Sequence, residues 1–100
     1  MAIEVNWSDE AKTTFDKNVY YLQTVWTEKE VAKFIQQTEY AINRIQQQPE
    51  SYQQGNRNKK IRKARLNKYI VLFYRYYKTK GEVSLLTFWN VKQDPKKLKY

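Results

Sequence analysis

The side chains most able to do chemistry in this sequence are basic, and they are concentrated in its second half. Residues 57–80 hold ten lysines and arginines and no acidic residue. Residues 51–100 carry fourteen basic side chains against two acidic ones, a net charge of +12, whereas residues 1–50 carry five against eight, a net of −3. Lysine and arginine bind phosphates and carboxylates. Because the charges are sorted by region, they favour a binding face for nucleic acid or an acidic protein over a merely solvated lysine surface.

Composition excludes several kinds of catalytic centre. The chain has no histidine and no cysteine, which removes Ser-His triads, Cys-His proteases, disulfides and the commonest metal ligands. Its two glycines, Gly55 and Gly81, cannot form a glycine-rich phosphate loop. We therefore expect no cofactor and no metal, and any reaction must use Arg, Lys, Tyr, Asp, Glu or hydroxyl groups.

The length of the chain fits one domain. With 100 residues, of which 16% are aromatic, the chain can bury a single modest core. We expect one domain over residues 1–100. No stretch is apolar enough for a membrane span and no signal-peptide pattern is visible, so we expect a cytoplasmic protein without a membrane partner.

Hydrophobic spacing predicts the elements that must position the basic side chains. Residues 2–7 alternate between apolar and polar types, as in a strand. Ser8 is a typical N-cap for a helix over 9–25, and Thr27 with Glu30 forms a capping-box pattern before a second helix that closes at residues 46–49. The expected buried positions of the two helices are Ala11, Phe15, Val19, Leu22, Trp26, Val31, Phe34, Ile35, Thr38, Ala41, Ile42 and Ile45.

The second half predicts three strands joined by short turns, over residues 60–66, 69–77 and 83–90. The middle one, YIVLFYRYY, indicates a central strand buried on both faces rather than a stacking platform for bases. The whole order predicts an α+β fold: an N-terminal strand, an antiparallel helical hairpin and a three-stranded antiparallel meander. The helices are expected on one face of a four-stranded sheet.

Several segments together resemble the RelE/ParE superfamily of toxins from type II toxin–antitoxin, or plasmid-stabilisation, modules. They are WSDEA at 7–11, the turn at 49–52, the YIVLFYR strand and LLTFWNVKQDPKKL at 85–98. The resemblance spans the whole chain. It implies a compact sheet carrying a helical hairpin, growth arrest by the toxin, and a cognate antitoxin that neutralises it and is often acidic where it binds.

The superfamily divides by mechanism. RelE-type members cleave messenger RNA on the ribosome with Lys and Arg as phosphate-binding groups and a Tyr, His or Glu for proton transfer, whereas ParE-type members poison DNA gyrase by protein contact. In this sequence the central Arg of the RelE pattern falls at Val71, the expected Tyr falls near Leu98, and Asn90 stands where some members have His. The incomplete pattern favours the ParE-like branch, with the ribosome-dependent nuclease as the alternative.

If the chain is a nuclease, its candidate catalytic residues are Arg62, Arg65, Lys92 and Tyr100. The candidate residues for binding nucleic acid or an acidic partner are Lys59, Lys60, Arg62, Lys63, Arg65, Lys68, Arg75 and Lys92. The expected target is DNA gyrase or the ribosome with its messenger RNA. A third hypothesis, from another class, is a non-toxic basic domain that binds nucleic acid.

Overall fold

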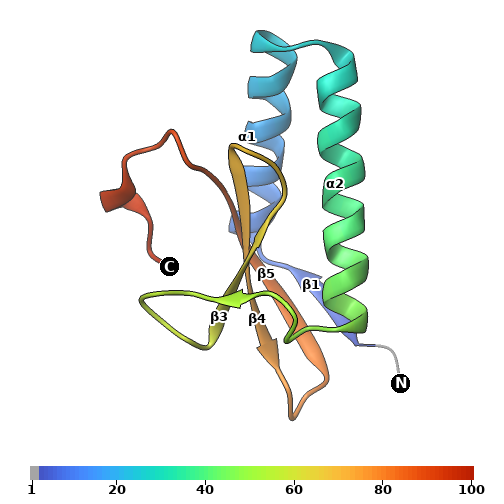
Figure 1. Cartoon of the computed structure of the whole chain (residues 1–100), viewed down its shortest axis with the longest axis vertical. Coiled ribbons are helices and arrows are strands. Elements are labelled where there is room, and N and C mark those ends of the chain that lie inside the picture. The colour runs from blue at the N-terminus through green and yellow to red at the C-terminus, as the bar shows by residue number, and fades with distance from the viewer. Residues whose placement is uncertain (1–2) are drawn as a thin grey trace.

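The computed structural model describes residues 3–100. Along the chain come β1 (Glu4–Trp7), α1 (Asp9–Val25), α2 (Glu28–Gln47), β2 (Gln53–Gln54), β3 (Ile61–Arg65), β4 (Ile70–Tyr77), β5 (Glu82–Asn90) and a short 3₁₀ helix (Pro95–Lys97). The α+β order is the predicted one, and α1 and α2 form an antiparallel hairpin (Figure 1). The predicted first strand included Ala2, which lies outside the described residues.

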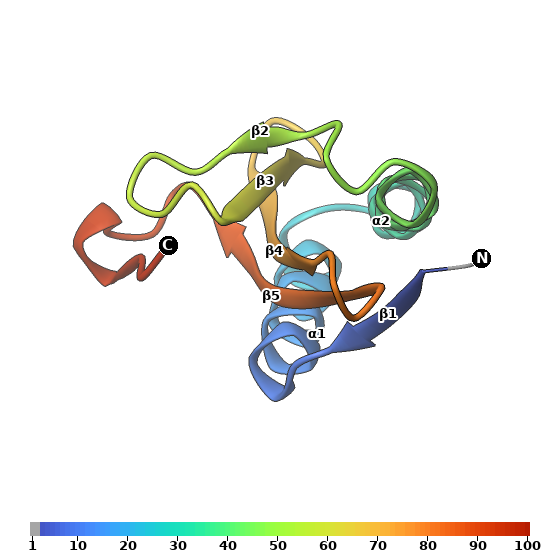
Figure 2. The same ribbon diagram turned by 90° about the horizontal axis from the view of Figure 1, so that it is seen from below.

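The sheet has five strands in the order β1-β5-β4-β3-β2 (Figure 2). The antiparallel meander of β3, β4 and β5 is as predicted, and β1 joins it parallel to β5. The prediction of four strands was wrong by one, because β2 consists of only Gln53 and Gln54, paired with Lys63 and Arg62 of β3. A strand of two exposed glutamines carries no hydrophobic alternation that a sequence could reveal.

The first helix begins where the sequence predicts. The Ser8 Oγ accepts a hydrogen bond from the Ala11 amide (3.0 Å) and donates to the Leu86 carbonyl (3.0 Å), so one side chain both caps α1 and ties it to β5. The capping box at Thr27 was wrong, since the Thr27 side chain makes no capping hydrogen bond. Residues 26 and 27 form an exposed joint between the helices, where water can satisfy the first amides of α2.

The helices pack on one face of the sheet through an aromatic cluster. Phe88 of β5 stacks on Trp7 with ring centroids 5.3 Å apart and meets Phe15 edge-on at 5.2 Å. Phe34 of α2 contacts both Phe15 and Phe88. Two expected core positions were wrong: Ile35 is 38% exposed, because it lies about a quarter turn away from Phe34, and Trp26 is 36% exposed, because its extended backbone leaves the line of α1.

Polar side chains of α1 cover the edge of β5 where β1 ends. The β1–β5 pairing stops at Leu85. Beyond it, the Phe88 amide donates to Thr14 Oγ1 (2.9 Å), and the buried Asn18 donates from Nδ2 to the Phe88 carbonyl (3.0 Å). The helix thus replaces a neighbouring strand, which protects the edge from pairing with another chain.

We expect Asn18→Leu to lower the free energy of unfolding by about 1–3 kcal/mol, because the buried Phe88 carbonyl loses its partner from α1. Urea unfolding followed by far-UV circular dichroism measures the change. Asn43→Leu is a matched control, since Asn43 is exposed on α2. Equal stability of the two variants would contradict this role for Asn18.

The face of the sheet opposite the helices carries a second, smaller core. Ile61, Val71 and Phe73 are buried there, and Leu98 and Tyr100 of the C-terminal segment pack against them. This burial on both faces is what the interpretation of residues 69–77 as a central core strand predicts. Among the described residues, neither helix is long and apolar enough to cross a membrane.

Candidate functional site

Arg62 on β3 ties the loop after α2 to the sheet. Its Nη1 atom donates to the carbonyls of Glu50 (3.1 Å) and Tyr52 (2.7 Å), and its Nη2 atom lies 3.9 Å from the Glu50 carboxylate. The guanidinium is mostly buried, with a side chain 17% exposed. Arg62 therefore acts as a structural clamp on residues 50–52.

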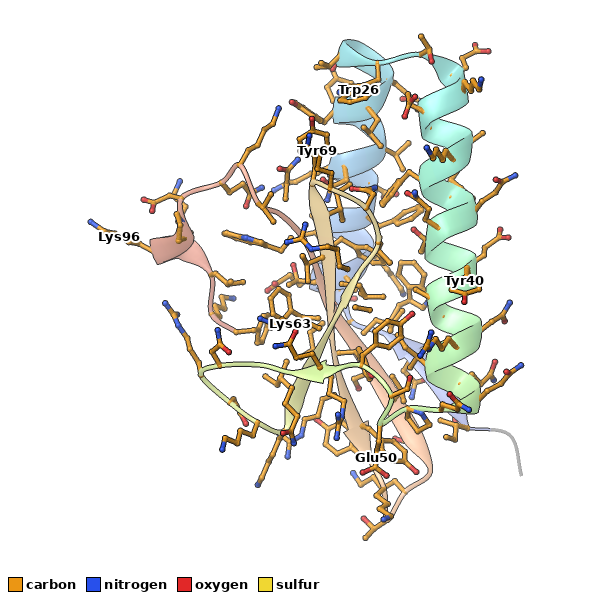
Figure 3. All side chains as sticks on the ribbon, viewed as in Figure 1. Trp26, Tyr40, Glu50, Lys63, Tyr69 and Lys96 are labelled. Atoms are coloured by element: carbon orange, nitrogen blue, oxygen red, sulfur yellow. The ribbon has the colours of Figure 1, made fainter. Side chains whose placement is uncertain are left out.

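Around Arg62 the structure gathers several of the predicted binding residues. A hollow of about 250 Å³ lies at the end of the sheet that holds the loop after α2. We call it the basic hollow, and its lining is Glu50, Gln54, Lys59, Lys60, Arg62, Arg75, Tyr76 and Lys78. Glu50 is its one acid and lies 4.0 Å from the Lys78 ammonium. In Figure 3, Glu50 marks this end of the molecule. Four of the eight predicted binding residues thus meet here, together with Lys78, which the prediction missed.

The four candidate catalytic residues do not meet in one place. Arg65 donates from Nη1 to the Lys68 carbonyl (3.0 Å) and lines a depression against α2 that excludes Arg62. Lys92 lies over the Tyr69 ring, 4.7 Å from its centroid, and lines a third depression beside α1. Tyr100 packs on Phe73 with ring centroids 5.9 Å apart, on the face of the sheet opposite the helices.

The remaining predicted binding residues are also dispersed. Lys63 is half-buried on β3, paired with Phe73 of β4, and Figure 3 places it away from Glu50, toward the middle of the sheet. Lys68 is exposed in the turn between β3 and β4. The basic half of the sequence therefore forms one concave cluster and several separate surface cations.

A larger apolar groove lies at the other end of the molecule. It has a volume of about 490 Å³ and runs between the tip of the helical hairpin and the β3–β4 turn. Trp26 and Tyr69 are among its lining residues, with ring centroids 5.7 Å apart (Figure 3). Sequence reasoning missed this groove, although Trp26 at the end of an apolar stripe and Tyr69 at a strand start were the available signals.

Burial raises the pKa of three tyrosines. The pKa values of Tyr52 and Tyr100 lie above the ordinary value because both rings are partly desolvated. Burial of Tyr74 raises its pKa to about 12. Its hydroxyl donates to the Pro49 carbonyl (2.7 Å), so Tyr74 holds the start of the same loop that Arg62 clamps.

The Tyr74 pKa predicts a loss of stability at alkaline pH. In the folded chain this phenol keeps its proton up to about pH 12, whereas in the unfolded chain it releases the proton near pH 10. The contribution of the protonated Tyr74 phenol to the free energy of unfolding is thus complete below pH 10. It falls by roughly 2–3 kcal/mol as pH rises from 10 to 12. Urea unfolding at several pH values measures the decline. We expect Tyr74→Phe to decline less, and an identical decline would contradict the assignment.

One family profile is similar to most of this chain. The sequence profile described as "ParE toxin of type II toxin-antitoxin system, parDE" matches residues 5–95. Among curated proteins, no sequence matches this chain.

Two solved structures share the fold. A chain of the chromosomal ParDE toxin–antitoxin system from P. aeruginosa superposes with a TM-score of 0.72 at 13% identity, covering 88% of this chain and 95% of that chain. A YoeB/ParE toxin from Agrobacterium tumefaciens gives a TM-score of 0.65 at 10% identity, covering 87% of this chain and 96% of that chain. Because the profile match covers most of the residues, this chain belongs to the ParE toxin family of type II toxin–antitoxin systems.

Proposed function

We propose that this ParE-family toxin arrests growth in the ParE manner, by poisoning DNA gyrase through protein contact in the cytoplasm, and that its cognate antitoxin neutralises it. The family itself implies the antitoxin partner. The observation that carries the choice of mechanism is the dispersal of the candidate nuclease residues Arg62, Arg65, Lys92 and Tyr100.

Cleavage of an RNA backbone needs its groups around one phosphate. A cation must stabilise the charge that develops on the phosphate, and a proton-transfer group must lie within hydrogen-bond reach of the attacking hydroxyl. Here Arg62 donates to a carbonyl of the loop after α2, and Arg65 donates to a carbonyl of the β3–β4 turn. Tyr100 packs on Phe73 at the opposite face of the sheet from the helices. Burial also raises the pKa of Tyr100, which makes it a poorer base at neutral pH. Poisoning by contact requires none of these groups to converge.

The experiment is induced expression of the chain in cells, with and without its antitoxin. Gyrase poisoning predicts growth arrest, induction of a DNA-damage reporter and trapped gyrase–DNA complexes, all reversed by the antitoxin. Mapping of RNA ends in the same cultures tests the nuclease alternative. Codon-boundary cleavage of messenger RNA without DNA damage would overturn the proposal, and normal growth with neither signal would favour the non-toxic nucleic-acid-binding alternative.

A further inference from the structure

The basic hollow is preorganised for an anion larger than one carboxylate. Arg62 is held in place by two backbone carbonyls. The guanidinium of Arg75 lies over the Tyr77 ring at 4.7 Å, and the Lys80 ammonium lies 5.6 Å from the same ring. Fixed arginines at the base and exposed lysines at the rim give a concave cationic surface whose orientation is set before any ligand arrives.

Cations continue beyond the hollow on its β4–β5 side. Lys80 follows Lys78 in that turn, and its ammonium lies 5.6 Å from the Tyr77 ring that Arg75 covers. Arg57 lies on the other side and donates from Nη1 to the Leu98 carbonyl of the C-terminal segment. One carboxylate cannot contact such a spread of charge, whereas a linear polyanion can contact it at several points. A row of phosphates is an anion of this kind.

The lining of the hollow distinguishes a nucleic acid from an acidic peptide. It holds no aliphatic residue, and its only ring is that of Tyr76. Protein partners are anchored mainly by apolar and aromatic side chains that enter pockets, whereas nucleic-acid interfaces are more polar and much more positive. The apolar groove with Trp26 and Tyr69, which suits a protein anchor, lies at the other end of the molecule (Figure 3).

We propose that the basic hollow binds the phosphodiester backbone of nucleic acid, with duplex DNA as its ligand. The choice of DNA over RNA rests on the proposed function, because gyrase presents a DNA duplex to any toxin that docks on it. Phosphates would contact Lys59, Lys60 and Lys78 without reading base sequence. The toxin would then hold both the enzyme and the DNA of a poisoned complex.

Glu50 is the internal competitor of the phosphate in this proposal. Its carboxylate lies 3.9 Å from Arg62 Nη2 and 4.0 Å from Lys78 Nζ, and its side chain is 57% exposed, so it is free to swing away. We expect Glu50→Gln to tighten binding of a short DNA duplex by about two- to fivefold near 0.1 M salt, because one negative charge leaves the site. Glu39→Gln, an exposed site on α2 with the same change in charge, is the matched control and should bind like the wild type.

A triple variant tests the lysines. Fluorescence anisotropy of a labelled duplex of mixed sequence, titrated with purified toxin at several salt concentrations, gives the slope of log affinity against log salt. The slope is negative, and the variant Lys59→Ala, Lys60→Ala, Lys78→Ala should make it shallower by about 2 to 3. Each lost phosphate contact removes about 0.9 from its magnitude. The control Lys12→Ala, Lys17→Ala, Lys29→Ala removes three exposed lysines of the helices and should leave the slope unchanged.

Each other outcome overturns the proposal. Equal losses of DNA affinity in the two triple variants would mean that DNA is attracted by the net charge and not by the hollow. Absence of DNA binding by the wild type would mean that the hollow is not a DNA-binding site. Tighter binding of an RNA hairpin through the same lysines overturns the choice of DNA, and preferred binding of polyglutamate overturns the choice of nucleic acid. A supercoiling assay on the same preparations separates the two proposals, because gyrase inhibition without DNA binding leaves the proposed function intact and removes only this inference.

Discussion

Replacing Phe88 with alanine is expected to lower the free energy of unfolding by about 3–5 kcal/mol, the range for removing a buried aromatic ring. The ring is 1% exposed and contacts the rings of Trp7, Phe15 and Phe34. Those contacts join β1, α1, α2 and β5, so the cavity left by the substitution cannot collapse from one side alone. Urea unfolding at neutral pH, followed by tryptophan fluorescence and circular dichroism, measures the loss.

The control for this variant is a large apolar residue that is not in the cluster. Tyr40→Ala removes a ring of similar size that is 66% exposed on α2, and it should change stability by less than about 0.5 kcal/mol. A Phe88→Ala variant as stable as Tyr40→Ala would contradict the assignment of the aromatic cluster as the centre of the core.

Replacing Arg62 with alanine is expected to lower the free energy of unfolding by about 3 kcal/mol, because two hydrogen bonds from a charged donor to backbone carbonyls are lost. The loop from Pro49 to Tyr52 would then keep the bond from the Tyr74 hydroxyl to Pro49 and the contacts of Arg44 with Ser51 and Tyr52. Lys60→Ala, in the turn just before β3, is the control, since this exposed side chain makes no such bond among the described residues. Its loss should cost less than about 0.5 kcal/mol.

Loss of toxicity in Arg62→Ala is the expected result of a loosened loop as well as of lost catalysis. Lys92→Ala is the sharper variant for catalysis, because the Lys92 ammonium lies over the Tyr69 ring at the surface. An Arg62→Ala protein as stable as the wild type would contradict the clamp role and return Arg62 to the candidate catalytic residues.

The sequence predicted the elements whose signals are local. Ser8 followed by two acidic residues located the start of α1 at Asp9, and the β-branched and aromatic run located β4. Each of these signals comes from residues within or next to a single element, so it does not depend on contacts with distant parts of the chain. The same is true of the α+β order, which depends on element types alone.

Features that depend on contacts between distant segments were not predictable. That Arg62 holds the loop after α2 depends on where the carbonyls of Glu50 and Tyr52 lie after folding. The basic hollow likewise forms only when the β4–β5 turn brings Lys78 beside residues 59–62. Charge arithmetic located the positive half of the chain, but only the fold separates a concave cluster from scattered surface cations.

The most direct test of the account is a supercoiling assay with purified gyrase and plasmid DNA. It compares the wild-type toxin with the triple variant Arg65→Ala, Lys92→Ala, Tyr100→Phe, once circular dichroism has shown that the variant is folded. We expect both proteins to inhibit supercoiling with the same potency and to trap gyrase on DNA. The reason is that the three substituted side chains do not converge on one catalytic site, so their loss should leave poisoning by protein contact intact. Unaffected supercoiling, together with messenger RNA cleavage on ribosomes by the wild type and not by the variant, would contradict the account.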